Sequence, residues 1–290
     1  MAAADPNRLA DLMRMLTPTK MRQTWRQTDR TGLRRQPVLD LHDYLDVHRR
    51  LDAIVRRVHQ EVRSGSYRPS EADVVTLEKK LGIPRRLVMP AAIDALVLQT
   101  LIDILEKQIK AKQPTQNAFY SRSHASPSID DFDGVFGYPW WILWPQFQAK
   151  IWKFARSSDY TVVTDISNYF DTVSLDRLRK SISAISTFRE PVLDFLFLLL
   201  EAFVWRPDYI PFSGIGLPQV NFDAPRLLAH AFLFVVDRFL EKETAGRYVR
   251  WMDDMDSASI AMRTVDGYSE TWTSASRPLE YDSTPRRRRF

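Results

Sequence analysis

Acidic residues follow two short apolar segments of the sequence, and this spacing could bring carboxylates together. Asp165 follows the β-branched segment of residues 160–164, and Asp253 and Asp254 follow the apolar segment of residues 248–252. If the two segments are neighbouring strands, their carboxylates converge at one end of a sheet. Carboxylate oxygens bind Mg²⁺, and two such ions about 3.5–4 Å apart stabilise the attacking and leaving oxygens of a phosphoryl transfer. Each acidic site taken alone is more typical of a strand cap or a turn.

Hydrophobic periodicity predicts the elements that must position these carboxylates. Apolar residues at helical spacing predict helices over residues 41–64, 92–110, 174–185, 191 onward and 226–243. Short β-branched or aromatic runs predict strands over residues 74–77, 160–164, 247–251 and 255–261, with a turn at 253–254 and a cation-bearing hairpin over 79–90. Residues 121–145 contain three prolines and are expected to form a loop, and the polar residues 1–40 a loosely ordered N-terminal arm. Helices flanking a small antiparallel sheet place the chain in the α+β class.

Composition indicates a folded chain and excludes the kinds of catalytic and metal site that need cysteine. Of the 290 residues, 44% are hydrophobic and 27% are charged, and there is no cysteine, which excludes disulfides, thiolate metal sites and a cysteine nucleophile. The net charge of +5 and the pI near 9.4 favour a polyanionic partner only weakly, because four arginines belong to the terminal run 286–289. The longest apolar runs contain charged residues, and the N-terminus is unlike a secretory signal. We therefore expect a cytoplasmic protein without a membrane partner.

The order of the surrounding motifs resembles that of reverse transcriptases over roughly residues 45–256. The segment 164–171 is similar to the first palm motif of that family, in which an aromatic residue, here Phe170, follows the aspartate by five positions. Gly216-Leu-Pro-Gln219, with residues 227–230 and Asp237 behind it, is similar to the second motif. The segment 248–254 is similar to the third, the Tyr-x-Asp-Asp box, with Trp251 in the place of the tyrosine.

Two further segments resemble the parts of the family that precede the palm. Residues 80–86, followed by Asp94 and Gln99, are similar to a fingers segment, and residues 118–122 to the aromatic-Arg segment that follows it. The resemblance is closest to the bacterial retron, group II intron and phage-defence enzymes. It implies a right-hand polymerase fold with fingers over residues 41–157 and a palm over 158–256, in which a small antiparallel sheet packs on helices.

The resemblance also implies an activity and its cofactors. The chain is expected to be an RNA-directed DNA polymerase that uses an RNA template, a DNA or RNA primer and deoxynucleoside triphosphates. Two Mg²⁺ ions, with Mn²⁺ as the alternative, would bind Asp165, Asp253 and Asp254, and the backbone carbonyl of Ile166 would join the ion on the incoming nucleotide.

Further residues receive a role from the same resemblance. Phe170 would act as a steric gate against a ribose 2′-hydroxyl, and Gln219 would contact the nucleotide. The triphosphate would bind Lys80, Arg85 and Arg86, since the forked guanidinium of arginine suits phosphate oxygens. Trp251 and Arg122 would contact the primer or template.

Several of these residues also have a purely structural interpretation. Phe170 could belong to the core, Arg85 and Arg86 to a solvated hairpin, and Gln219 to a loop. His230, on an apolar helix face, is more typical of a core histidine than of a ligand. Tryptophans 140, 141 and 144 could stack on a template, but packing is the simpler interpretation.

The sequence departs from the family at three places. Val220 stands where the second motif normally has glycine, and Trp251 is bulkier than the usual tyrosine. Beyond Asp256 the resemblance stops, and residues 257–290 are expected to be a disordered basic tail in place of a thumb. This pattern favours a truncated or frame-shifted polymerase, or one that works with a separately encoded thumb or partner protein.

Two other functions remain open from the sequence. One keeps the carboxylate site but drops the template, which would give untemplated or protein-primed DNA synthesis in antiviral defence. The other is a catalytically inactive nucleic-acid-binding protein, whose binding would fall steeply with salt but would not need Asp253 or Asp254.

Overall fold

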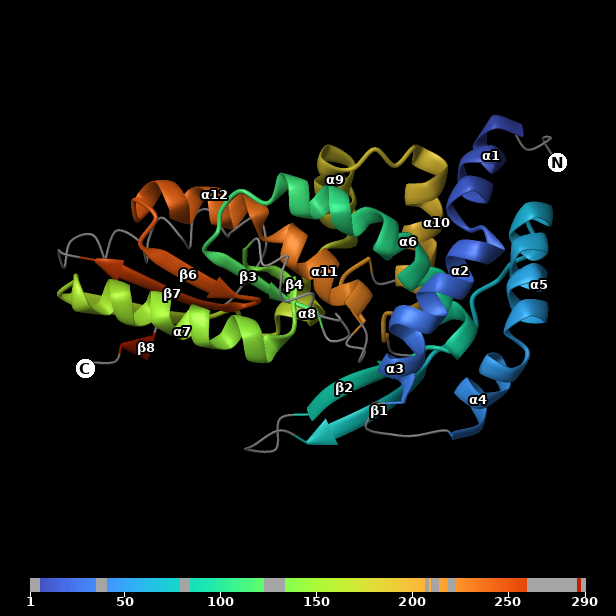
Figure 1. Cartoon of the computed structure of the whole chain (residues 1–290), viewed down its shortest axis with the longest axis horizontal. Helices are drawn as coiled ribbons and strands as arrows, with labels where there is room; N and C mark the ends of the chain where they lie inside the picture. The colour runs from blue at the N-terminus through green and yellow to red at the C-terminus, as the bar shows by residue number, and fades with distance from the viewer. Residues whose placement is uncertain are drawn as a thin grey trace. The chain divides into compact units, whose positions relative to one another are not determined.

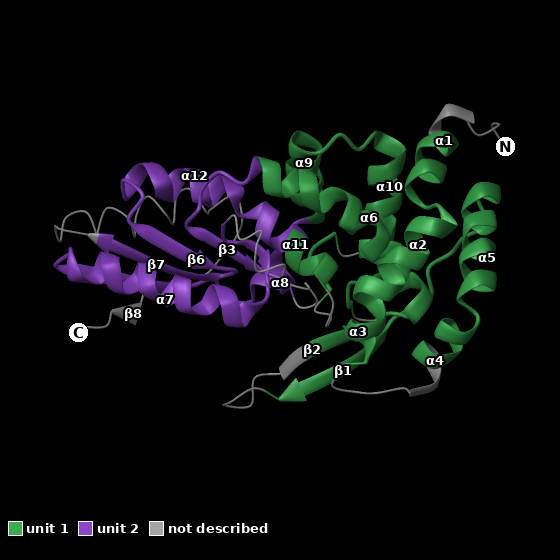
Figure 2. Cartoon of the chain, viewed as in Figure 1, with its two compact units in different colours: residues 1–111, 175–227 green, residues 112–174, 228–290 purple. Residues whose placement is uncertain are grey.

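A computed structural model describes residues 6–34, 41–78, 84–122, 134–206, 209, 214–218, 223–259 and 286–287. The chain forms two compact units, and each is assembled from segments distant in the sequence (Figure 2). Unit 1 comprises residues 1–111 and 175–227, and unit 2 comprises residues 112–174 and 228–290. This interleaved division differs from the sequential order of arm, fingers, palm and tail expected from the sequence.

Unit 1 consists mainly of helices (Figure 1). Its one described strand pair is antiparallel, with β1 (Asp73–Glu78) beside β2 (Pro84–Met89). The hairpin predicted over residues 79–90 therefore starts earlier, because the strand predicted over residues 74–77 is its first strand. The helices are α1 (Pro6–Met15), α2 (Pro18–Thr24), the π-helix η1 (Trp25–Asp29), α3 (Arg30–Leu33), α4 (Leu41–Arg49), α5 (Leu51–Ser64), α6 (Ala92–Lys112), α9 (Leu175–Ile185), α10 (Glu190–Phe203) and α11 (Asp223–Phe232), of which α6 and α11 extend into unit 2.

The N-terminal residues are helical, and the expectation of a loosely ordered arm is wrong for residues 6–33. Leu16, Met21 and Trp25 are fully buried, and the indole Nε1 of Trp25 donates a hydrogen bond to His48 Nδ1 at 3.2 Å. The few large apolar side chains in this polar segment therefore anchor it in the core of unit 1, because each buried side chain contributes hydrophobic stabilisation.

The helices predicted from periodicity are confirmed with two changes. The predicted helix over residues 41–64 is divided at Arg50, whose φ of −108° interrupts α4 and α5. Gly65 ends α5 with a φ of +70°, a left-handed conformation that glycine adopts without strain. The helix predicted over residues 226–243 is likewise divided at Leu233 into α11 and α12 (Phe234–Glu243).

Unit 2 is built on a six-stranded sheet with the order β4-β3-β6-β7-β5-β8. The strands are β3 (Ala118–Ser121), β4 (Phe136–Tyr138), β5 (Tyr160–Asp165), β6 (Tyr248–Trp251), β7 (Asp254–Ser259) and β8 (Arg286–Arg287). The α+β class is confirmed, but the sheet is mixed, because β3 pairs in parallel with both β4 and β6. Two segments of the expected disordered tail are strands, since β7 extends to Ser259 and β8 pairs with β5.

Helices cover both faces of this sheet, with α12 on one side and α7 (Trp140–Arg156) on the other (Figure 1). Side chains of β6 alternate between the faces, so Tyr248 and Arg250 contact Asp237 of α12. Val249 packs on the opposite face with Phe147 of α7. The short helix α8 (Tyr169–Thr172) follows β5.

Helix α7 contradicts the loop expected up to residue 145. Proline 145 lies in its second turn, where it removes one backbone hydrogen bond without ending the helix. Leu143 and Phe147 pack against Phe119 of β3, and this burial outweighs the lost bond. Among the described residues, no helix is both long enough and apolar enough to cross a lipid bilayer.

Candidate active site

Aspartates from two adjacent strands meet at one end of the sheet in unit 2. Asp165, the last residue of β5, lies directly opposite Asp254, the first residue of β7. Asp253 stands next to this pair in the turn between β6 and β7, where Trp251 is the register partner of Asp254. The turn therefore consists of residues 252 and 253, one position earlier than expected. The structure thus places two of the three aspartates named from the sequence opposite each other, and the third next to Asp254 along the chain.

A fourth carboxylate extends this acidic end of the sheet. Asp256 lies two residues after Asp254 on β7, opposite Val163 of β5, and side chains two apart on a strand point to the same face. The pKa of Asp254 is raised above its ordinary value because the surrounding atoms reduce its contact with water and because Asp165 and Asp256 repel its charge. Ionised Asp254 is therefore less favourable in the folded chain than in water.

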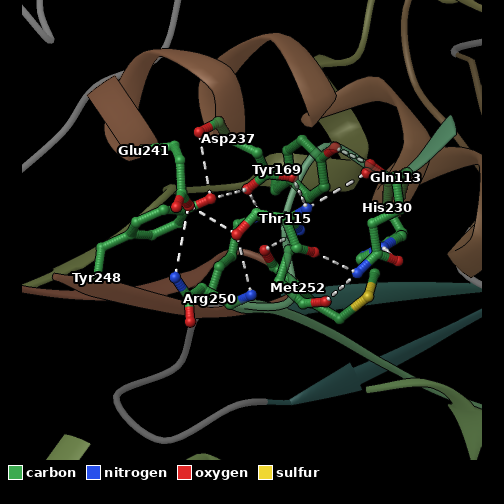
Figure 3. A network of polar contacts seen from close by, with 12 residues as sticks. Gln113, Thr115, Tyr169, His230, Asp237, Glu241, Tyr248, Arg250 and Met252 are labelled. Atoms are coloured by element: carbon green, nitrogen blue, oxygen red, sulfur yellow. Dashed lines mark hydrogen bonds and ion pairs between the residues drawn. The ribbon is translucent and has the colours of Figure 1, made fainter. Parts of the chain in front are cut away.

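A buried ion pair between Arg250 and Asp237 lies next to the turn between β6 and β7 and bonds its backbone at Met252 (Figure 3). Arg250 of β6 and Asp237 of α12 are both fully buried, and Nε and Nη2 of Arg250 donate to the two carboxylate oxygens at 2.7 and 2.5 Å. Nη1 of the same guanidinium donates to the carbonyl oxygen of Met252 at 3.0 Å. Met252 has a φ of +56°, which a non-glycine residue rarely adopts, so this hydrogen bond stabilises an unfavourable turn conformation.

Two other hydrogen bonds are accepted by carboxylates of helix α12 (Figure 3). Tyr248 Oη donates to Asp237 Oδ1 at 3.3 Å, and Thr115 Oγ1 donates to Glu241 Oε2 of α12 at 2.6 Å. Burial and the charge of Asp237 raise the pKa of the Tyr248 hydroxyl, which therefore stays protonated. The first contact connects α12 to β6, and the second connects α12 to the segment just before β3.

His230 belongs to this core and not to the acidic site. It is fully buried among the rings of Tyr120, Phe136 and Phe234, and its Nε2 lies 3.3 Å from Gln113 Oε1. Burial and the nearby charge of Arg250 hold the pKa of His230 well below its usual range. The imidazole is therefore neutral and acts as a packed core residue, in agreement with the structural interpretation of the sequence.

Unit 2 also contains four of the other residues singled out from the sequence. Ile166 is buried directly after Asp165, and Phe170 is half-buried with its ring 5.6 Å from that of Tyr169. Trp251 is half-buried between Phe119, Trp144 and Phe147. Arg122 follows β3, where its backbone N–H donates to the carbonyl oxygen of Tyr138.

The expected triphosphate-binding residues belong to unit 1. Arg86 of β2 is exposed, and its guanidinium lies 3.5 Å from the centre of the Trp205 ring, a cation–π contact that orients the side chain. Lys80, Gln219 and Val220 lie outside the described residues, as does the side chain of Arg85.

Sequence reasoning missed two residues of the site, although each carries a recognisable signal. Asp256 repeats the acid of Asp254 at the two-residue spacing of a strand. Arg250 interrupts an apolar strand, and a charged residue in such a position needs a buried partner of opposite charge. The sequence does not show which residue pairs with Arg250. Only the packing of β6 on α12 shows that it is Asp237.

The donor atoms of the acidic end suit a hard divalent cation. Within the described ranges, no three acidic or histidine side chains are already arranged as a metal-binding group. Mg²⁺ nevertheless binds commonly through one or two carboxylates, with water and substrate phosphates completing its ligands. The carboxylates of Asp165 and Asp254, which are directly opposite residues of β5 and β7, fit this chemistry.

Comparisons with known proteins give a distant likeness only. No protein-family model and no curated protein matches the chain. Among solved structures, it is similar to apo telomerase from Candida tropicalis truncated from the C-terminal domain, at 10% sequence identity and a TM-score of 0.48. The match covers 76% of this chain and 50% of the telomerase chain, so the chain spans half the length of that structure.

Proposed function

We propose that this chain is a nucleotidyltransferase of the reverse transcriptase type, an RNA-directed DNA polymerase whose reaction takes place at Asp165, Asp253 and Asp254. The observation that carries the proposal is the pairing of Asp165 with Asp254 across β5 and β7, beside a turn that contains Asp253. The order of the motifs in the sequence supports the same reaction, because these three aspartates occupy the acidic positions of the first and third palm motifs.

The residues of the acidic site would hold two Mg²⁺ ions, or Mn²⁺ in their place. The aspartates supply carboxylate oxygens, and Ile166 supplies a backbone carbonyl directly after Asp165. When bound, such ions activate a primer 3′-hydroxyl and stabilise the charge of the pyrophosphate leaving group. The protein positions these groups, and Arg250 contributes by holding the carbonyl of Met252 at the turn.

The nucleotide and the primer would contact residues outside the three aspartates. Phe170 would exclude a ribose 2′-hydroxyl, and Arg86, with the nearby residues Lys80 and Arg85 of the sequence, would bind the triphosphate. The ring of Trp205 supports this role for Arg86 because the cation–π contact restricts the guanidinium. Gln219 would contact the nucleotide, and Trp251 and Arg122 the primer or template.

Primer extension with the full 290-residue protein tests the proposal. The assay contains an RNA template, a DNA primer, deoxynucleoside triphosphates and Mg²⁺, and it compares the wild type with Asp253→Asn. Asp159→Asn is the matched control. This exposed aspartate lies just before the first residue of β5, whereas Asp165 is the last residue of that strand.

We expect template-directed product with the wild type and the control, and none with Asp253→Asn. Product whose sequence ignores the template would instead indicate untemplated or protein-primed synthesis. A folded wild type that binds RNA but gives no product would contradict the polymerase proposal and indicate a nucleic-acid-binding protein.

A further inference from the structure

Helix α7 exposes an unusual number of tryptophans. Of the eight tryptophans in the chain, four lie on this 17-residue helix with between 39% and 59% of their surface exposed: Trp140, Trp141, Trp144 and Trp152. We call this set the α7 tryptophan face. Large apolar side chains gathered at a surface typically mark an interaction site, since their exposure to water is unfavourable.

One edge of this face joins the core of unit 2, because the ring of Trp144 lies 5.3 Å from that of Phe147 and 5.4 Å from that of Trp251. Leu143 and Phe147 pack against Phe119 and Val249 of the sheet. The other three tryptophans of the face, Trp140, Trp141 and Trp152, are each more than half exposed. Trp141 and Trp152 are eleven residues apart, which is close to three helical turns, so they lie on one side of α7 about 16 Å apart along its axis. That separation is long enough for several stacked nucleotides.

Charge indicates the kind of partner. Helix α7 contains no acidic residue, and Lys153 and Arg156 are exposed in its last turns. The third cation, Lys150, is occupied within unit 2, because its Nζ donates to the carbonyl oxygen of Gln116 and to Asn117 Oδ1. Aromatic rings beside cations, with no acid among them, suit a phosphate backbone whose bases stack on the rings.

We propose that the α7 tryptophan face is a stacking platform for single-stranded nucleic acid, with Lys153 and Arg156 contacting its phosphates. The platform lies beside the acidic site, because the ring of Trp144 is 5.4 Å from that of Trp251, the register partner of Asp254. A strand stacked on α7 is thus bound next to the carboxylates. This binding requires no catalysis, so it stands or falls independently of the proposed polymerase activity.

Binding of a fluorescent 20-nucleotide single strand, followed by anisotropy in EDTA with the full-length protein, tests this proposal. We expect Trp141→Ala and Trp152→Ala each to weaken binding about tenfold, the loss typical of one stacked base. Trp152→Phe keeps an aromatic ring and should retain most of the affinity. Val235→Ala, which truncates another exposed apolar side chain of unit 2, is the matched control and should bind normally.

Salt dependence separates stacking from charge. For Lys153→Gln and Arg156→Gln, we expect the slope of log affinity against log salt to fall by about 0.7 for each phosphate contact removed. Unchanged thermal melting of all variants would show that they fold, as expected for exposed positions. The aspartate variant Asp253→Asn should bind the strand as the wild type does, whether or not the wild type polymerises.

Three results would overturn the proposal. The wild type could fail to bind the strand at low salt, or the tryptophan variants could bind it as well as the wild type does. Alternatively, sedimentation could show that the wild type self-associates and that Trp141→Ala or Trp152→Ala abolishes this, which would make the face an interface between copies of the chain.

Discussion

Asp254 faces Asp165 across two hydrogen-bonded strands, with Asp256 on the same side of β7. Like charges directly opposite on a sheet destabilise it, and the raised pKa of Asp254 reflects both that repulsion and reduced contact with water. A carboxylate cluster of this kind is unfavourable for folding alone. It becomes favourable when a cation binds between its members, which is the condition that the proposed reaction requires.

Asp254→Asn should therefore stabilise the metal-free protein while removing activity. Because the pKa of this carboxyl is raised in the folded chain, the folded state loses stability as pH rises from about 3.8 through the folded pKa, and the cost stays constant above it. We expect a higher melting temperature than the wild type at pH 7 in EDTA, and no difference below pH about 4. Primer extension should fall at least about 100-fold.

Added Mg²⁺ provides the internal check on this prediction. The cation binds the charged carboxylates of the wild type, so it should raise the melting temperature of the wild type more than that of Asp254→Asn. Asp159→Asn should melt and respond to Mg²⁺ as the wild type does. A wild type more stable than Asp254→Asn in EDTA would show that the carboxylate is already stabilised by another group.

Phe170 offers a second test at the scale of one side chain. If its ring fills the space of a 2′-hydroxyl, Phe170→Ala should incorporate ribonucleotides at least about tenfold more efficiently relative to deoxynucleotides, since the steric conflict is gone. The measurement is the ratio of kcat/KM for the two nucleotide classes. Tyr169→Phe removes a hydroxyl that bonds the Ala229 carbonyl and keeps the ring, so this control should leave the ratio unchanged. If Phe170→Ala gave the same ratio as the wild type, the ring of Phe170 would have a packing role only.

At the scale of elements, the β6–β7 hairpin depends on helix α12. The turn itself is conformationally unfavourable at Met252, and the guanidinium that bonds its carbonyl is fixed by Asp237 on α12. The acidic residues of one hairpin are thus positioned by a charge on a neighbouring helix. A residue that contacts neither nucleotide nor metal can in this way determine where Asp253 lies.

Breaking the Arg250–Asp237 pair should be costly. Asp237→Leu leaves a buried arginine without its partner, and we expect a loss of about 3–5 kcal/mol in the free energy of unfolding, measured with urea. The double variant Asp237→Leu/Arg250→Met replaces both charges by apolar groups and should recover most of that stability. Its primer extension should be low, because Arg250→Met removes the hydrogen bond to the Met252 carbonyl. Full activity in the double variant would show that Arg250 does not position the turn.

At the scale of the whole molecule, unit 2 combines a neutral buried histidine with a buried ion pair in one core. Such a core responds to pH even though the groups are far from solvent, because unfolding exposes His230 to protonation. Its pKa is lower in the folded chain than in the unfolded chain, so its contribution to stability is present at neutral pH and is lost on acidification.

His230→Phe should flatten the pH dependence of unfolding. Below pH about 6.5 the unfolded chain binds a proton at His230 that the folded chain does not, which lowers the free energy of unfolding by up to about 1.4 kcal/mol per pH unit. Urea unfolding at pH 7 and pH 5 should show this slope in the wild type and its loss in His230→Phe. Gln113→Leu keeps the imidazole and should keep the slope. If the free energy of unfolding changed equally with pH in the wild type and in His230→Phe, another titratable group would cause the pH response.

The sequence alone determined the local features of this protein. The α6, α9 and α10 helices, strands β1 and β5, and the acids at the ends of β-branched or apolar segments all follow from periodicity and capping within about twenty residues. Together with the order of the motifs, which resembles that of reverse transcriptases, those features named Asp165, Asp253 and Asp254 as one candidate site. They could not show that β5 pairs with β7 and not with β6, because strand order depends on contacts between segments about 90 residues apart.

Only the tertiary structure decided which side chains share a buried or an exposed surface. Residues 121–145 read as a loop by their three prolines, yet packing of Leu143 and Phe147 on the sheet makes residues 140–145 part of α7 and leaves Trp140 and Trp141 exposed. Arg250 and Asp237 stand thirteen residues apart with no pattern that joins them, and only packing of β6 on α12 buries them as a pair. Burial is a property of the assembled core, so no local pattern contains it.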